Sequence, residues 1–142
     1  MTASPLRRGN WSVQEMQRMR ALLPRRGVVD TARLLRRTAD SVRRKALELF
    51  SAKPRRTPWT AEDDMALRES WGALEPRLLA ALLGRTTPDL HKRALQLRSK
   101  IASGPWTRED DQLLKQYYGT RRDEDLELCL LRPKAEIDAA AA

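Results

Sequence analysis

The sequence W-T-A-E-D-D at residues 59–64 is the clearest of three similar stretches in this chain. W-S-V-Q-E at residues 11–15 and W-T-R-E-D-D at residues 106–111 begin the other two, which puts the tryptophans 48 and 47 residues apart. A shift of 48 also aligns L-L-R-R-T at residues 34–38 with L-L-G-R-T at residues 82–86, without a gap. A period of this length indicates one small supersecondary unit used three times.

The repeat divides the chain into three expected units. They cover residues 9–50, 59–100 and 106–142, with a basic linker at residues 51–58 and a second linker at residues 101–105. Because a unit of this size buries only a limited fraction of its surface, we expect the tryptophan of each unit to serve as a large core residue.

Each unit has the signals of three helices. Thr60 is followed three residues later by Asp63, the arrangement of a capping box at a helix start, and the other two units repeat it. Pro76 suits the first turn of a second helix. We expect Thr87 to cap a third helix that ends near Ser99. The expected fold class is all-α, with three tandem three-helix units of helix-turn-helix type.

The charge is large and unevenly distributed. The chain has a net charge of +9 and an isoelectric point near 10.6. Residues 1–57 hold 15 basic and 4 acidic residues, residues 58–103 hold 7 and 6, and residues 104–142 hold 6 and 9. The net charges are therefore +11, +1 and −3. A basic N-terminal half favours an anionic partner, with nucleic acid ahead of a membrane or an acidic protein.

Basic residues cluster on the third helix of the first two units. These candidate DNA contacts are Arg43, Arg44 and Lys45 in the first unit and His91, Lys92 and Arg93 in the second. We expect the first set to matter more, because it has no acidic cluster nearby to offset it. The alternative is that both sets form an ordinary solvated helix face.

Two further basic pairs precede the tryptophans of the first two units. They are Arg7 and Arg8 before the first unit and Arg55 and Arg56 in the linker. These pairs are either flexible tails or arms that neutralise phosphates or enter a minor groove.

These motifs resemble Myb/SANT-like repeats, which share the pattern W-[ST]-x-x-[ED]-[DE] followed by L-L-G-R-T. The compact form found here is similar to the bacterial and phage branch of these homeodomain-like repeats. The chain differs from animal and plant repeats in keeping only the first of their regularly spaced tryptophans in each unit, with Ala46 and Ala94 on the third helices, although the second unit also contains Trp71. The resemblance implies double-stranded DNA as partner, third helices in the major groove, and a role in transcription regulation or DNA organisation.

The third unit departs from this pattern because it is acidic. We expect it to meet a protein partner, through Glu124, Asp125, Glu127 and Asp138, or to pack on its neighbour. The rival hypothesis for the whole chain is a SANT-type protein-interaction module. RNA binding is less favoured, since no set of exposed aromatic residues suggests a stacking surface.

Other functional classes lack their motifs. We find no signature of an enzyme and expect no catalytic residue and no cofactor. With one histidine and one cysteine the chain has no zinc-binding set, so no metal site is expected. Cys129 lies among leucines and is expected to be a buried thiol. Because no signal peptide or membrane-length apolar run is present, we expect a cytoplasmic, nucleoid-associated protein, or a nuclear one in a eukaryote.

Overall fold

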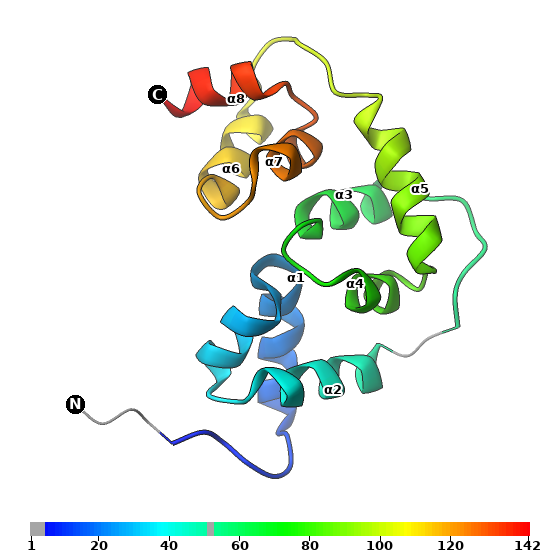
Figure 1. The fold of residues 1–142 in the computed structure, drawn as a ribbon, viewed down its shortest axis with the longest axis vertical. Helices are drawn as coiled ribbons and strands as arrows, with labels where there is room; N and C mark the ends of the chain where they lie inside the picture. Colours follow the sequence, from blue (N-terminus) through cyan, green and yellow to red (C-terminus); the bar gives the residue numbers. More distant parts are fainter. Residues whose placement is uncertain (1–4, 51–52) are drawn as a thin grey trace.

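The structure is a computed structural model that describes residues 5–50 and 53–142, and it is all-α over that range (Figure 1). Eight helices and no strand form among these residues: α1 (Val13–Leu35), α2 (Ala39–Leu49), α3 (Ala61–Ser70), α4 (Pro76–Leu83), α5 (Thr87–Arg98), α6 (Arg108–Tyr117), α7 (Asp123–Leu130) and α8 (Lys134–Ala141). Residues 51 and 52 of the expected linker 51–58 lie outside the described residues. The expected all-α fold class is confirmed.

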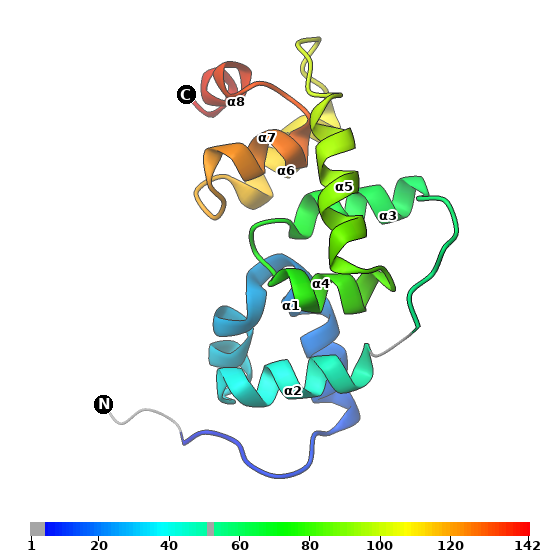
Figure 2. The same ribbon diagram turned by 45° about the vertical axis from the view of Figure 1, so that its right-hand side comes forward.

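Three groups of helices follow one another along the long axis of the molecule (Figures 1 and 2). α1 and α2 lie at one end, α3, α4 and α5 in the middle, and α6, α7 and α8 at the other end. No helix of residues 5–50 and 53–142 is both long and apolar enough to cross a membrane.

Local capping interactions explain where α1, α3 and α6 begin. The side chains of Ser12, Thr60 and Thr107 each accept a hydrogen bond from the backbone N–H three residues on, and the acidic residue there returns one. The capping boxes expected from the sequence are therefore confirmed.

The expected cap of α5 was wrong by one residue. Thr86, not Thr87, is the N-cap, and its hydroxyl accepts from the Asp89 N–H at 3.2 Å. Thr87 is already helical and Pro88 occupies the first turn, where its missing N–H costs nothing.

α1 consists of two helical segments. Its backbone leaves the helical region at Gly27, where φ is 79° and ψ is 177°. A Cβ atom at this position would lie 2.3 Å from the carbonyl oxygen of Ala73, in the turn between α3 and α4. The kink therefore brings α1 against the middle part of the molecule as closely as a glycine allows.

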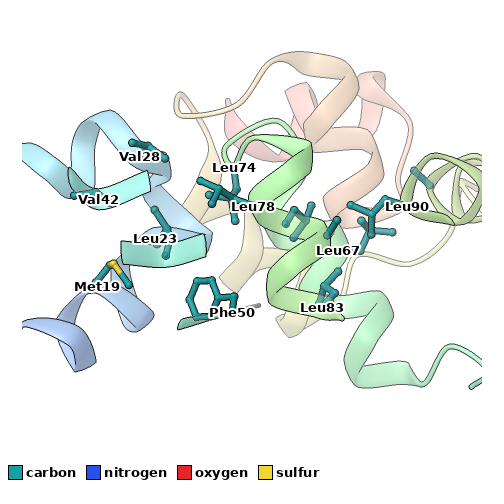
Figure 3. Packing of buried hydrophobic residues seen from close by; sticks show 14 of the residues in the cluster. Met19, Leu23, Val28, Val42, Phe50, Leu67, Leu74, Leu78, Leu83 and Leu90 are labelled. Atoms are coloured by element: carbon teal, nitrogen blue, oxygen red, sulfur yellow. The ribbon is translucent and has the colours of Figure 1, made fainter. Parts of the chain in front are cut away.

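The first five helices share one hydrophobic core (Figure 3). It runs from Met19 and Leu23 in α1 to Leu67 in α3 and Leu90 in α5, and it includes Leu128 from α7. A smaller cluster, made of Leu113, Leu114, Tyr117, Leu126, Cys129, Leu130 and Ile137, lies within α6, α7 and α8. The first two expected units thus form a single packed body.

The tryptophans lie at the edges of these cores. Trp11 and Trp59 pack half-buried against the larger cluster, and Trp106 packs against the smaller one. The largest fully buried side chains are Tyr117 and Met19. The tryptophans therefore contribute to the cores as expected, but from the edge, and an arginine covers one face of the Trp11 ring and of the Trp59 ring.

The last three helices dock onto the rest of the molecule through polar contacts as well as Leu128. Arg68 of α3 donates to the Cys129 carbonyl at 2.6 and 3.0 Å. Arg121 donates to the carbonyls of Arg25 and Glu69 at 2.6 and 3.0 Å. Because these carbonyls lie near the end of the first segment of α1 and of α3, one guanidinium caps two helices.

Candidate nucleic-acid interface

A buried arginine organises the turn before α2. Arg37, which is 4 % exposed, donates from Nε and Nη2 to the two carboxylate oxygens of Glu15 at 2.9 and 2.8 Å. It also donates to the carbonyls of Gly9 and Asn10 at 2.9 and 3.2 Å. Its guanidinium lies 4.6 Å from the centre of the Trp11 ring. One side chain thus joins the start of α1, the turn and the preceding segment.

Arg85, 48 residues later, makes a similar set of contacts before α5, although its Nε has no hydrogen-bond partner among the described residues. It is 5 % exposed, pairs with Asp63 at 3.2 Å, and lies 4.8 Å from the centre of the Trp59 ring. It donates to the carbonyls of Arg55, Thr57 and Pro58. In the last three helices, Arg132 pairs with Asp110 at 2.9 Å and donates to the Pro105 carbonyl at 2.8 Å. We call Arg37, Arg85 and Arg132 the clamp arginines.

The clamps hold their carboxylates in the ionised form. The hydrogen bond from Arg37 lowers the pKa of Glu15 below its usual value, against the opposing effect of burial. Burial of Asp63 would raise its pKa, but hydrogen bonds from Thr60, Arg85 and Arg55 outweigh this and lower it. Each clamp is therefore a charged pair at neutral pH.

The clamps also order the basic segments that precede the tryptophans. Besides the clamp contacts, the backbone N–H of Arg7 donates to the Arg36 carbonyl, and that of Arg55 donates to the Gly84 carbonyl, both at 2.6 Å. The two bonds are related by the same shift of 48 residues. Of the two alternatives left open by the sequence, the contacts favour ordered arms over flexible tails.

Each arm forms one wall of a concave groove, and a helix forms the other. The first groove, about 700 Å³, is lined by Arg7, Arg8, Gly9, Asn10, Trp11, Arg37, Thr38, Ser41, Arg44, Lys45 and Glu48. The second groove, about 530 Å³, is lined by Arg55, Arg56, Thr57, Trp59, Arg85, Thr86, Asp89, Lys92, Arg93 and Gln96. Every lining residue of the second groove corresponds to one of the first at a shift of 48.

In the first groove, some of the cations expected to contact DNA have no protein partner and others form long ion pairs. Arg8 and Arg44 are exposed and make no hydrogen bond or ion pair within the described residues. Arg7 lies 3.8 Å from Glu15, and Lys45 lies 3.4 Å from Glu48 in an exposed pair. These cations remain accessible to an anionic ligand, because long exposed pairs are weak.

Arg43 does not line the first groove. Its guanidinium donates to Glu75, at the start of α4, at 2.7 Å, and to Asp40 at 3.2 Å. The hydrogen bond to Glu75 raises the pKa of Arg43. The expectation that no acidic cluster offsets this position was wrong, because Asp40 pairs with it and packing of α2 beside α4 adds Glu75 from the next unit.

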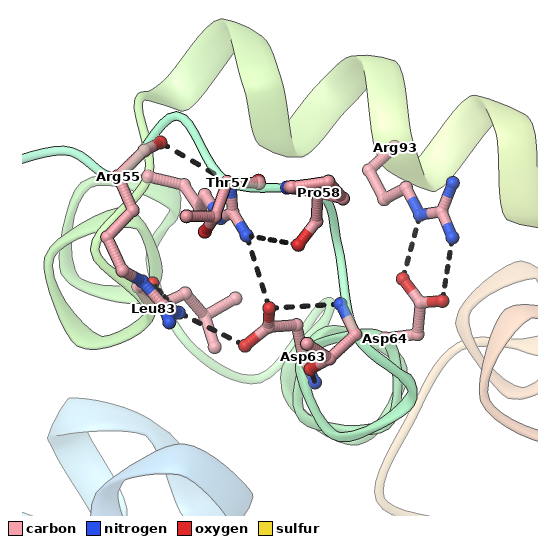
Figure 4. A network of polar contacts seen from close by, with 9 residues as sticks. Arg55, Thr57, Pro58, Asp63, Asp64, Leu83 and Arg93 are labelled. Atoms are coloured by element: carbon pink, nitrogen blue, oxygen red, sulfur yellow. Dashed lines mark hydrogen bonds and ion pairs between the residues drawn. The ribbon is translucent and has the colours of Figure 1, made fainter.

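The second groove has fewer available cations. Arg93 is held by Asp64 through two hydrogen bonds of 2.7 Å, and that pair raises its pKa (Figure 4). Arg55 pairs with Asp63 at 3.1 Å. Lys92 and Arg56 are exposed, with no hydrogen bond or ion pair to another described residue.

His91 lies outside both grooves. Its ring lies nearly perpendicular to the ring of Trp71, with ring centres 5.3 Å apart. Of the six helix residues expected to contact DNA, the grooves therefore include Arg44, Lys45, Lys92 and Arg93 and exclude the other two.

The last three helices contain a clamp arginine, but they have no cations at the positions that correspond to those of the second groove. At a shift of 47, Arg55, Arg56, Lys92 and Arg93 correspond to Ala102, Ser103, Ala139 and Ala140. The clamp that orders the turn is thus separate from the residues available to a ligand.

Three of the four acidic side chains expected to meet a protein partner are buried or paired within the chain, and the side chain of Glu124 is exposed. Asp125 is 4 % exposed and lies against Gly72. The expectation that it is a surface residue was therefore wrong. The Glu124 carbonyl accepts from Arg98, Glu127 accepts from the Lys134 N–H, and Asp138 pairs with Lys134. Docking of α7 on α3 and α5 explains the burial of Asp125.

Sequence reasoning missed the clamp arginines and Asp64. The clamps had a signal, since an arginine follows the paired leucines in all three units, but its partner is distant in sequence. Cys129 is buried as expected, and burial raises the pKa of its thiol to about 12. Among the described residues, no three His, Cys, Asp or Glu side chains form a group that could hold a metal ion.

Comparison with protein-family models, curated proteins and solved structures finds no match to this chain.

Proposed function

We propose that this chain is a double-stranded DNA-binding protein built from three tandem Myb/SANT-like helix-turn-helix repeats. The two corresponding grooves carry the proposal. Each combines an ordered basic arm with one face of a helix, and each presents unpaired cations from both walls. An anionic backbone alongside such a groove would meet both walls at once.

The two walls have different roles in this proposal. Arg7, Arg8, Arg55 and Arg56 neutralise phosphates, which fixes the position of the protein on the duplex. Arg44 and Lys92 point outward from α2 and α5, and they approach base edges in the major groove. Such a protein would act in transcription regulation or DNA organisation, in the cytoplasm near the nucleoid or in a nucleus.

The protein-interaction alternative has less support. It relied on four acidic residues of the third unit, of which Asp125 is buried, Glu127 accepts from the Lys134 N–H and Asp138 pairs with Lys134, which leaves the exposed Glu124 side chain.

Salt dependence of duplex binding tests the proposal. The two grooves offer the cations Arg7, Arg8, Arg44, Lys45, Arg55, Arg56 and Lys92. If about seven phosphates are neutralised, the slope of log K against log salt is about −6. Arg8→Ala and Arg56→Ala should each reduce the slope by about 1. Arg108→Ala removes an exposed charge from α6 and should leave it unchanged. A slope near zero, or no binding at low salt, contradicts the proposal.

A further inference from the structure

An exposed leucine occupies the outer face of α5. Leu95 is 71 % exposed, and it follows Lys92 by three residues, so the two side chains are neighbours on one face of the helix. The core-facing residues Leu90, Ala94 and Leu97 lie on the opposite side. Leu95 is therefore an apolar side chain on the face that also presents the accessible cation of the second groove.

The first unit has a leucine in the corresponding place, but that leucine is covered. Leu47 corresponds to Leu95 at a shift of 48, and it is half-buried against the shared core. α2 packs beside α4, and an ion pair between Arg43 and Glu75 links α2 to the start of α4. Leu47 thus helps to join the first two units, whereas Leu95 has no comparable cover from the described residues.

The surroundings of Leu95 favour a ligand that combines negative charge with a small apolar group. Lys92 is a cationic neighbour on the same face, and it lines the adjoining groove together with Arg55 and Arg56. In the major groove of duplex DNA, the apolar group that a side chain meets is the C5-methyl group of thymine. A leucine beside a lysine matches a thymine methyl next to acceptor atoms of the neighbouring base pair.

Building on the proposed DNA binding, we propose that Leu95 is a specificity-determining residue that contacts a thymine methyl group. Replacing thymine by uracil removes that methyl and leaves the Watson–Crick pair unchanged. Loss of one buried methyl-sized contact should weaken binding about three- to fivefold.

The test uses duplexes that the full chain selects from a random pool, synthesised with either thymine or uracil. The full chain should bind the thymine form about three- to fivefold more tightly for each contacted methyl. Leu95→Ala should bind both forms equally, at about the affinity of the full chain for the uracil form. Val29→Ala removes a side chain of similar exposure, 72 %, from α1 and should keep the thymine preference.

The outcomes separate this inference from the proposed function. Steep salt-dependent binding with equal affinity for the two forms overturns the role of Leu95 and leaves DNA binding in place. A thymine preference that survives in Leu95→Ala also overturns it. If no duplex is bound at low salt, both the inference and the proposed function fail.

Discussion

At the scale of single residues, the clamp arginines determine the local geometry. Arg37 and Arg85 each bring together a capping acid, a tryptophan ring and the carbonyls of an arm. A guanidinium can do this because it has five N–H donors in a rigid planar fork, which lysine lacks. Removing it would take a donor from the arm carbonyls and from the capping carboxylate, which would keep only its remaining partners.

We expect Arg85→Ala to lower the free energy of unfolding by about 1–3 kcal/mol, because a part-buried carboxylate and several carbonyls lose a charged donor. Urea denaturation followed by circular dichroism measures this. Arg56→Ala removes an exposed charge from the same groove and should change stability by less than about 0.5 kcal/mol. Equal, small effects of the two substitutions would contradict the clamp role of Arg85.

Acid should weaken the clamps. The pKa of Glu15 is lowered from 4.5 in the folded state, so its contribution to stability is present above the unfolded pKa and is lost as pH falls through the folded pKa. Urea denaturation at pH values from about 6 down to 3 should show stability falling below about pH 4.5. In Glu15→Gln the decrease in stability should be smaller, because one carboxylate with a lowered pKa is gone. Some decrease should remain, because Asp63 and Asp110 still titrate. If the stability of Glu15→Gln fell with pH as steeply as that of the unsubstituted chain, Glu15 would not contribute to the acid sensitivity.

At the scale of helices, neighbouring arginines on α2 have different roles. Arg43 is held by Glu75 and Asp40, whereas Arg44 is exposed in the first groove. Helix geometry explains the difference, because residues one position apart point about 100° apart. On α5, Arg93 is likewise held by Asp64, whereas its neighbour Lys92 is exposed.

We therefore expect Arg44→Ala to weaken duplex binding by about 1–3 kcal/mol if it contacts a base. Arg43→Ala removes the same charge one residue away, and it should change binding less and stability by up to about 1 kcal/mol. Binding titrations at fixed salt compare the two variants. Equal losses of affinity would mean that both act only as general counter-charges.

At the scale of the whole molecule, the acidic last part behaves as a docked partner for the first two. Arg121 joins it to carbonyls of α1 and α3, Tyr117 donates to Glu69 at 3.0 Å, and Leu128 enters the shared core. Removing residues 104–142 would also remove these contacts, so point substitutions are the cleaner test of this docking.

We expect Arg121→Ala to lower the free energy of unfolding by about 1–3 kcal/mol, because two helix-end carbonyls lose a donor. Arg122→Ala, at the next position, breaks only a pair with Asp125 in which the arginine side chain is 78 % exposed, and should cost at most about 1 kcal/mol. Urea denaturation measures both. Equal stabilities of the two variants would show that the Arg121 contacts do not hold the parts together.

Sequence alone determined the features that depend on near neighbours. Capping boxes join residues three apart, so Ser12, Thr60 and Thr107 marked helix starts that the structure confirms. The all-α class followed from these signals, and the correspondence of the two arms followed from the shift of 48 residues. The charge difference between the two ends of the chain is likewise a property of composition.

Only the tertiary structure decided which charges and apolar groups stay accessible. Arg43 and Arg93 are occupied by Glu75 and Asp64, which lie 32 and 29 residues away in sequence. Leu47 and Leu95 share a register, yet one is covered and the other is exposed. The physical reason is that burial and ion pairing depend on which helices pack together, and a repeat that preserves each unit does not fix how successive units meet.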